Sequence, residues 1–288
     1  MKIFILPISE EFQLKDQPFI YPNHNKDYGV EQDFLLFLKN NGYLLTNNFM
    51  EADWHYLPIY WTRWHLNHDY AKNGLEQLEN QIKKVIINDS KTFTICQYDD
   101  GPVVDLKETL LFLSSRKSND GFDIPLLSSK HKLPLIKPKK KYLASFVGRI
   151  NTNEIRKKMY NILKEQKDIF IFDGDLGSSF FVKTILRSYI SLSPRGYGGS
   201  SFRFFESMQL GAVPYLISGV NTLSFKKYIK WENFCLYSEN ERDLIEKLNY
   251  YNKEKLIEMG KKNKEFFNFN LDYQKWCKFV IKELEDLK

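Results

Sequence analysis

Short apolar runs alternate with segments of helical spacing along most of this chain. The runs predict strands, and apolar residues three and four positions apart predict helices between them. Predicted strands cover residues 2–8, 43–45, 52–58, 84–87, 92–96, 142–148, 169–172, 189–192 and 215–217, and predicted helices cover 29–40, 74–82, 153–164, 180–186, 201–210 and 271–288. Asn151 or Thr152 is the expected N-cap of the helix over 153–164. This alternation is typical of βαβ units and mostly parallel sheets.

A lysine-rich segment with two prolines, residues 128–142, interrupts the pattern near the middle of the chain, and the alternation restarts after it. Such a composition is typical of an extended linker. We therefore expect an α/β fold of two Rossmann-like domains that face an interdomain cleft. The predicted parts are a first domain over 1–130, a linker over 131–141, a second domain over 142–270, and a C-terminal helix over 271–288 that could pack back on either domain, including the first.

The composition narrows the class of protein. With 288 residues and 43% apolar residues the chain can bury a sizeable core, and its 16% aromatic residues suit a core or a sugar-binding cleft. The net charge of +6 is scattered rather than dense, so we expect no nucleic-acid partner. It suits a diphosphate ligand or contact with an anionic membrane surface. The three cysteines are far apart in the sequence, which predicts buried free thiols in a reducing compartment. No apolar run reaches the length of a membrane span, so we expect a cytoplasmic protein.

The run from Ser193 to Glu206, Ser-Pro-Arg-Gly-Tyr-Gly-Gly-Ser-Ser-Phe-Arg-Phe-Phe-Glu, carries the strongest chemical signal. It predicts a strand end, a glycine-rich turn and an abrupt helix start, where free backbone N–H groups can hold a phosphate. Arg195 and Arg203 flank the turn and suit phosphate oxygens. Glu206, three residues after Arg203, suits ribose hydroxyls. The remaining predicted donor-binding residues of the turn are Gly196, Tyr197, Gly198, Ser200 and Ser201.

Each of these features also has a plainer interpretation. A glycine-rich turn is often only a tight connection, and Arg203 with Glu206 could form a surface ion pair. Gly148 and Arg149 close another predicted strand, and ligands bind outside the carboxyl ends of parallel strands. Both residues are therefore candidates for the same phosphate site, with a solvated surface role as the alternative for Arg149.

A carboxylate that could activate an acceptor hydroxyl is expected in the first half. Asp99 and Asp100 follow the predicted strand over 92–96 and are the candidate catalytic bases, although paired acids before Gly-Pro are also common in turns. Glu31 and Asp53 are weaker alternatives. Trp61 and Trp64 are candidates for stacking on an acceptor sugar.

Metal ligation is not expected. Asp173-Gly174-Asp175 resembles a metal-binding Asp-x-Asp but follows a strand in the second half and is interpreted as a turn. His55, His65 and His68 lie in an aromatic setting that suits packing. Arginines and a helix dipole can take a metal's role at a diphosphate, so we expect neither a metal nor a cofactor.

Together these segments resemble the exostosin-type glycosyltransferases, a GT-B-like group that transfers sugars from nucleoside diphosphates. The block over 193–214 is similar to the family's Pro-Arg-Gly-Tyr-Gly, Ser-Phe-Arg, Phe-Glu and Gly-Ala-Val-Pro run, and weaker similarity lies in 143–148 with 155–158 and in 52–60. The resemblance covers about residues 28–240. The family's Gly-Arg-Asp-His-type segment is not visible, and Gln97-Tyr98-Asp99-Asp100-Gly101-Pro102 stands in its place.

The resemblance implies a GT-B fold and transfer of a sugar from a UDP- or GDP-linked donor, with inversion at the anomeric carbon. It also implies a nucleotide contact for Glu206. The expected acceptor is a glycan or a lipid-linked saccharide in polysaccharide biosynthesis, reached at a membrane surface. The alternatives are a non-catalytic nucleotide- or sugar-binding protein of the same fold, a basic nucleic-acid-binding protein, and a different nucleotide-linked transferase or epimerase.

Overall fold

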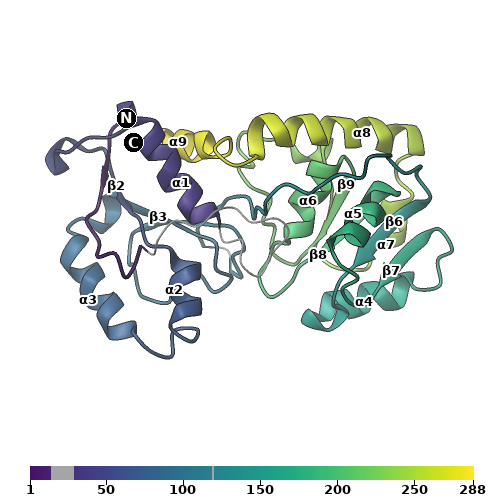
Figure 1. The fold of residues 1–288 in the computed structure, drawn as a ribbon, viewed down its shortest axis with the longest axis horizontal. Helices are drawn as coiled ribbons and strands as arrows, with labels where there is room; N and C mark the ends of the chain where they lie inside the picture. Colours follow the sequence, from purple (N-terminus) through teal and green to yellow (C-terminus); the bar gives the residue numbers. More distant parts are fainter. Residues whose placement is uncertain (14–28, 119) are drawn as a thin grey trace.

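Two parallel sheets form the frame of the protein in a computed structural model that describes residues 1–13, 29–118 and 120–288 (Figure 1). The first has the order β1-β2-β3-β4-β5 and the second the order β10-β9-β8-β6-β7, and every strand pair is parallel. The strands are β1 Ile3–Ile5, β2 Trp54–Leu57, β3 Thr92–Cys96, β4 Leu110–Leu113, β5 Phe122–Asp123, β6 Tyr142–Val147, β7 Ile169–Phe172, β8 Ser188–Pro194, β9 Val213–Ile217 and β10 Leu236–Ser238. The predicted α/β class with two parallel, Rossmann-like halves is confirmed.

Helices cover both sheets, as parallel strands require. They are α1 Gly29–Asn40, α2 Trp61–Asn67, α3 Leu75–Val85, α4 Glu154–Leu163, α5 Ser178–Leu186, α6 Phe202–Leu210, α7 Leu244–Leu248, α8 Lys253–Phe266 and α9 Cys277–Asp286. Within the described ranges, no helix combines the length and apolar character that a membrane crossing needs. Cys96, Cys235 and Cys277 are buried free thiols, as expected from their apolar settings.

The local predictions were wrong at three places. Residues 84–87 do not form a strand, because Leu78, Ile82 and Val85 keep the helical spacing of α3 and bury its inner face. Residues Gly42–Leu44 form a 3₁₀ turn instead of a strand. The helix α4 is capped by Asn153, whose side chain accepts a hydrogen bond from the amide of Ile155 at 3.1 Å, and not by the two residues before it.

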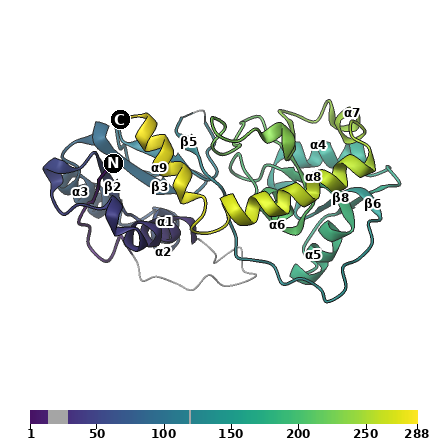
Figure 2. The same ribbon diagram turned by 90° about the horizontal axis from the view of Figure 1, so that it is seen from above.

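The C-terminal part of the chain spans both halves (Figure 2). Helix α8 packs beside α6, and the chain then passes through a π-helical turn, Phe267–Leu271, into α9. The buried carboxylate of Asp33 in α1 accepts hydrogen bonds from the amide of Gln274 and the indole of Trp276, each at 2.8 Å. The Trp54 indole donates to the carbonyl of Leu284 at 3.0 Å. The tail is therefore tied to the first half, while the predicted domain boundaries remain a prediction.

Candidate functional site

The glycine-rich loop after β8 packs against the first half of the molecule. The amide of Gly199 donates to the carbonyl of Arg116 at 3.1 Å, and a Cβ on Gly199 would lie 2.5 Å from that carbonyl oxygen. A Cβ on Gly198 would overlap Ser115 and approach the Asp99 carboxylate to 2.6 Å. Glycine is needed at both positions because the loop meets the ends of β3 and β4 without space for a side chain.

This contact creates a pocket of about 270 Å³ between the halves, which we call the smaller pocket. The loop and the first turns of α6 and α4 line it on one side, and Asp99, Ser115 and Leu126 line it on the other. Ser201 is the N-cap residue of α6, yet its side chain makes no capping hydrogen bond in the described structure. A helix N-terminus of this kind favours an anion. The predicted residues at the pocket are Gly196, Tyr197, Gly198, Ser200, Ser201, Arg203 and Glu206.

Two guanidinium groups share the wall of the smaller pocket. Arg203 lies over the ring of Phe146, 4.4 Å from its centroid, and donates to the carbonyl of Val147. Arg156 lies 5.6 Å from the same ring and donates to the carbonyls of Arg195, Arg149 and Pro194 at 2.9, 3.0 and 3.3 Å. The two guanidinium groups are therefore held in place by stacking on Phe146 and by hydrogen bonds to carbonyl groups at the ends of β6 and β8.

The electrostatics of this pair favour an anionic ligand. Burial, and then the charge of Arg156, lowers the pKa of Arg203 to about 9, against the opposing effect of Glu206. Burial lowers the pKa of Arg156 to about 10. The Nε atom of Arg203 is buried without a hydrogen-bond partner in the described part of the chain. A diphosphate in the pocket would supply the missing countercharge and acceptors.

Glu206 is held by the segment that joins the two halves. Its Oε1 atom lies 2.6 Å from Nε2 of His131 and accepts from the Ser128 hydroxyl at 3.3 Å. The amide of His131 donates to Oε1 of Gln209 at 2.9 Å. His131 and Glu206 are both buried, so the first part of the predicted linker is packed on α6. The carboxylate is thereby fixed at the edge of the smaller pocket.

Asp99 lies where the smaller pocket meets a second cavity. This larger pocket has a volume of about 580 Å³ and shares Asp99, Leu126, Tyr197 and Phe202 with the smaller one. Burial raises the pKa of Asp99, against hydrogen bonds from Ser115 and Gly198 and the charge of Lys117. A carboxyl group with a raised pKa at the junction of two pockets is a suitable proton acceptor. The further lining residues are Thr62, Leu66, Tyr70, Gln97, Tyr98, Asp100 and Lys117.

The other predicted residues have different positions. Asp100 lines the larger pocket but is exposed and forms an ion pair with Lys117. The side chain of Arg195 donates to the carbonyls of Gly198 and Tyr197 at 3.2 and 3.4 Å, within its own loop. Arg149 is exposed and lines neither of these two pockets. Gly148 lies behind Arg203, because a Cβ there would be 2.6 Å from the guanidinium.

The expectation that Trp61 and Trp64 stack on an acceptor sugar is corrected by the structure. Both side chains are completely buried in the core of the first half. The indole of Trp61 donates to the Thr94 hydroxyl at 2.9 Å, and Trp64 stacks on His68 with ring centroids 4.5 Å apart. The aromatic side chains at the larger pocket are instead Tyr70, Tyr98, Tyr197 and Phe202.

The Asp-Gly-Asp motif has the geometry of a turn. Asp173 accepts from the amide of Ile150 at 2.9 Å, and Asp175 accepts from the amide of Gly177 at 2.7 Å. Both carboxylates therefore order their local backbone. No group of three potential metal-ligating side chains gathers anywhere in the described ranges.

Alternation and motif analysis missed Arg156, His131 and Ser115 as site residues. Arg156 carried a signal, since it lies in the first turn of a helix after a glycine-ended strand. His131 and Ser115 lie in segments without regular structure and reach the site only through tertiary packing. Fold and pocket together define a GT-B-type α/β protein with an arginine-lined pocket between its halves.

The chain belongs to the exostosin GT47 domain family, whose family model matches residues 1–249. Among solved structures it is similar to TarM, with 10% identity over 72% of this chain and 57% of TarM and a TM-score of 0.39. It is also similar to AviGT4, a glycosyltransferase involved in avilamycin A biosynthesis, with 9% identity, 99% and 97% coverage and a TM-score of 0.42. A putative UDP-N-acetylglucosamine 2-epimerase from Listeria monocytogenes gives 12% identity, 90% coverage of each chain and a TM-score of 0.35. This chain thus spans 57% of the length of TarM. Scores this low carry no argument about the site.

Proposed function

We propose that this protein transfers a sugar from a nucleoside diphosphate to a hydroxyl group of a glycan or lipid-linked saccharide. The observation that carries the proposal is the position of Asp99, which lines both the arginine-bearing smaller pocket and the tyrosine-lined larger pocket. A donor in the smaller pocket and an acceptor in the larger one would meet at this carboxylate. Family membership supports the same reaction class.

The chemistry follows from these positions. The bond between the anomeric carbon and the diphosphate oxygen breaks, and the departing diphosphate gains negative charge. Arg156, Arg203 and the α6 N-terminus would stabilise that charge without a metal. The acceptor oxygen forms the new bond to the anomeric carbon and gives its proton to Asp99. Attack from the face opposite the leaving group inverts the anomeric configuration. Glu206 would hold the ribose hydroxyls.

A thermal-shift screen tests donor binding, since a ligand that binds only the native state raises the melting temperature. We expect one of the UDP-, GDP-, ADP- and CMP-sugars to stabilise the protein in the presence of EDTA. Arg203→Ala and Glu206→Ala should each abolish the shift. Arg242→Ala, at an exposed arginine of the same half, is the matched control and should retain it. A full shift in folded Arg203→Ala and Glu206→Ala protein would contradict the donor site.

The second candidate function is a non-catalytic nucleotide- or sugar-binding protein. It is favoured by the hydrogen bonds that the Asp99 carboxylate accepts from Ser115 and from the amide of Gly198. These bonds use part of the capacity of the carboxylate to accept a proton from an acceptor hydroxyl. Product formation from the stabilising donor separates the two functions. A binding protein would show the thermal shift with no released nucleoside diphosphate.

A further inference from the structure

A strap of basic residues crosses between the two halves on the outside of the molecule. It covers residues 130–141 and contains six lysines, Lys130, Lys132, Lys137, Lys139, Lys140 and Lys141. No acidic residue occurs anywhere from 124 to 153. In Figure 2 the strap runs along the outer side of α5.

Both ends of the strap are anchored. At one end His131 contacts Glu206 and Gln209 of α6. At the other end the Lys140 ammonium donates to the carbonyl of Ser188, and burial together with the charge of Lys137 lowers the pKa of Lys140 to about 8. Residues 133–139 therefore form a tip held between two fixed points.

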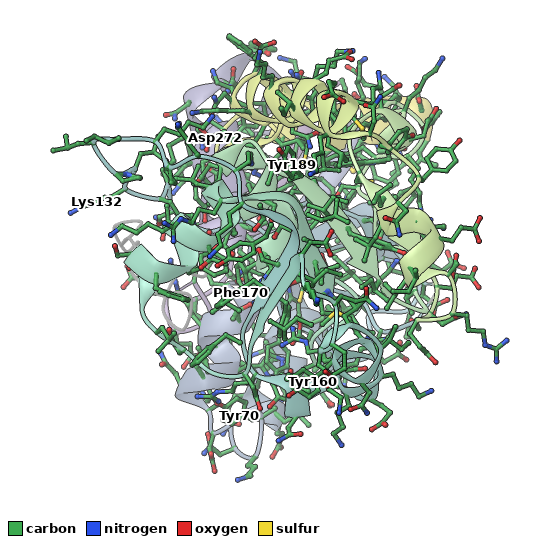
Figure 3. All side chains as sticks on the ribbon, turned by 90° about the vertical axis from the view of Figure 1, so that its right-hand side faces the viewer. Tyr70, Lys132, Tyr160, Phe170, Tyr189 and Asp272 are labelled. Atoms are coloured by element: carbon green, nitrogen blue, oxygen red, sulfur yellow. The ribbon has the colours of Figure 1, made fainter. Side chains whose placement is uncertain are left out.

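The tip exposes aliphatic side chains to an unusual extent. Leu135 is fully exposed, Ile136 is 86% exposed and Leu133 is 53% exposed. Single exposed aliphatic residues are common, but two adjacent ones with this exposure favour an apolar environment outside the protein. Figure 3 shows the neighbouring Lys132 on a loop that projects from the edge of the molecule.

Cations surround these aliphatic residues. Lys132, Lys137, Lys139 and Lys141 are exposed, and none forms an ion pair within the described ranges, whereas Lys130 is paired with Asp272. Helix α5 and its C-cap residue add two exposed cations, Lys183 and Arg187. Lys183 lines the same small cavity as Lys132 and Leu133, and the carbonyl of Arg187 accepts from the amide of Lys141 at 2.7 Å.

We propose that the strap docks on the surface of an anionic lipid bilayer, with Leu135 and Ile136 inserted among the headgroups and acyl chains. Aliphatic side chains flanked by lysines match such an interface, which offers apolar chains below a layer of negative charge. A nucleic acid would satisfy the lysines but offer no apolar phase for Leu135 and Ile136. A second copy of this chain would bring like charges together. The strap is joined to the site through His131, which contacts Glu206 at the edge of the smaller pocket.

Vesicle co-sedimentation of the full chain tests this proposal. We expect binding to phosphatidylcholine vesicles with about one third phosphatidylserine, little binding to pure phosphatidylcholine, and release as salt rises. Leu135→Ser/Ile136→Ser should weaken binding about tenfold or more. Lys137→Gln/Lys139→Gln should weaken it by a similar factor, and more so at low salt.

Two control variants match these changes elsewhere on the surface. Met50→Ser/Ile87→Ser removes two side chains that are 86% and 76% exposed, and Lys255→Gln/Lys262→Gln removes the same charge from lysines paired with Glu258. Both should bind like the parent. Equal binding of the parent to the two vesicle types would overturn the proposal, as would parent-like binding by both strap variants. A strap variant that changes only self-association, or only binding to RNA, would overturn it as well. The thermal shift that a nucleotide-sugar causes in the strap variants tests the transferase proposal independently of membrane binding.

Discussion

The two pockets at the cleft differ in the chemistry of their walls. The smaller pocket combines two guanidinium groups, a helix N-terminus without a side-chain cap, the Glu206 carboxylate held by His131, and the shared Asp99. The larger pocket combines three tyrosines with two carboxylates and a lysine that is already paired. The first wall is matched to a compact anion, and the second to a neutral molecule rich in hydroxyl groups. The two pockets are therefore expected to respond to substitution in separable ways.

The largest effect is expected at the shared residue Asp99. Asp99→Asn keeps the shape of the side chain but removes the proton acceptor, so kcat should fall by about 10²–10⁴-fold. The donor thermal shift should remain, since the arginines are untouched.

Because burial raises the pKa of Asp99, the acidic limb of the parent's kcat/KM profile should lie at higher pH than for an exposed aspartate, with activity lost as pH falls. Asp100→Asn is the matched control and should change kcat by less than about threefold. Equal losses in the two variants would remove the distinction between the carboxylates.

The next largest effect is expected at Arg203, on the donor side alone. Arg203→Gln should lower kcat/KM for the donor by about 10²–10³-fold, because one charge at the departing diphosphate is lost. Arg203→Lys should recover only part of this, since lysine lacks the planar fork that stacks on Phe146. Steady-state kinetics with varied donor and acceptor concentrations measure kcat/KM for the donor and KM for the acceptor separately. A loss confined to the acceptor KM would mean that Arg203 belongs to the larger pocket.

The difference between the pockets also explains which parts were predictable from sequence. Most residues that line the smaller pocket lie between Gly196 and Glu206, so a local pattern identified most of them. The larger pocket is assembled from separate segments around Thr62, Tyr98, Lys117 and Tyr197, and no local pattern links them. The aromatic run at Trp61 suggested a sugar platform, but α2 turns that face into the core. Strand alternation predicted part of each sheet but missed β4, β5 and β10. It also failed at 84–87, where the helical spacing of α3 outweighs β-branched composition.

A buried carboxylate below the larger pocket gives the third prediction, of intermediate size. The Glu31 carboxylate accepts hydrogen bonds from the backbone amide of Gln97 at 2.9 Å and from the Thr62 hydroxyl at 3.0 Å. Gln97 and Thr62 both line the larger pocket. Burial raises the pKa of Glu31 from 4.5 to about 7. A raised carboxyl pKa contributes stability that is fully present below pH 4.5 and is lost as pH rises through about 7.

The free energy of unfolding of the parent should therefore fall by up to about 3 kcal/mol across that range relative to Glu31→Gln. Urea denaturation at several pH values measures the difference. Glu76→Gln, at an exposed glutamate, should follow the parent. Parallel pH profiles for Glu31→Gln and the parent would show that Glu31 does not titrate with folding.

The smallest effect is expected at His131, which acts on the smaller pocket from outside it. His131 holds Oε1 of Glu206 at 2.6 Å and so positions the carboxylate for the ribose. Loss of one such hydrogen bond is worth about 1 kcal/mol, so His131→Leu should raise the donor KM about fivefold with kcat nearly unchanged. His131→Gln retains an N–H donor at a similar reach and should restore most of the affinity. A kcat loss in both variants, or no rescue by glutamine, would mean that His131 serves only to pack the strap against α6. The acceptor KM should not change in either variant, because neither His131 nor Glu206 lines the larger pocket.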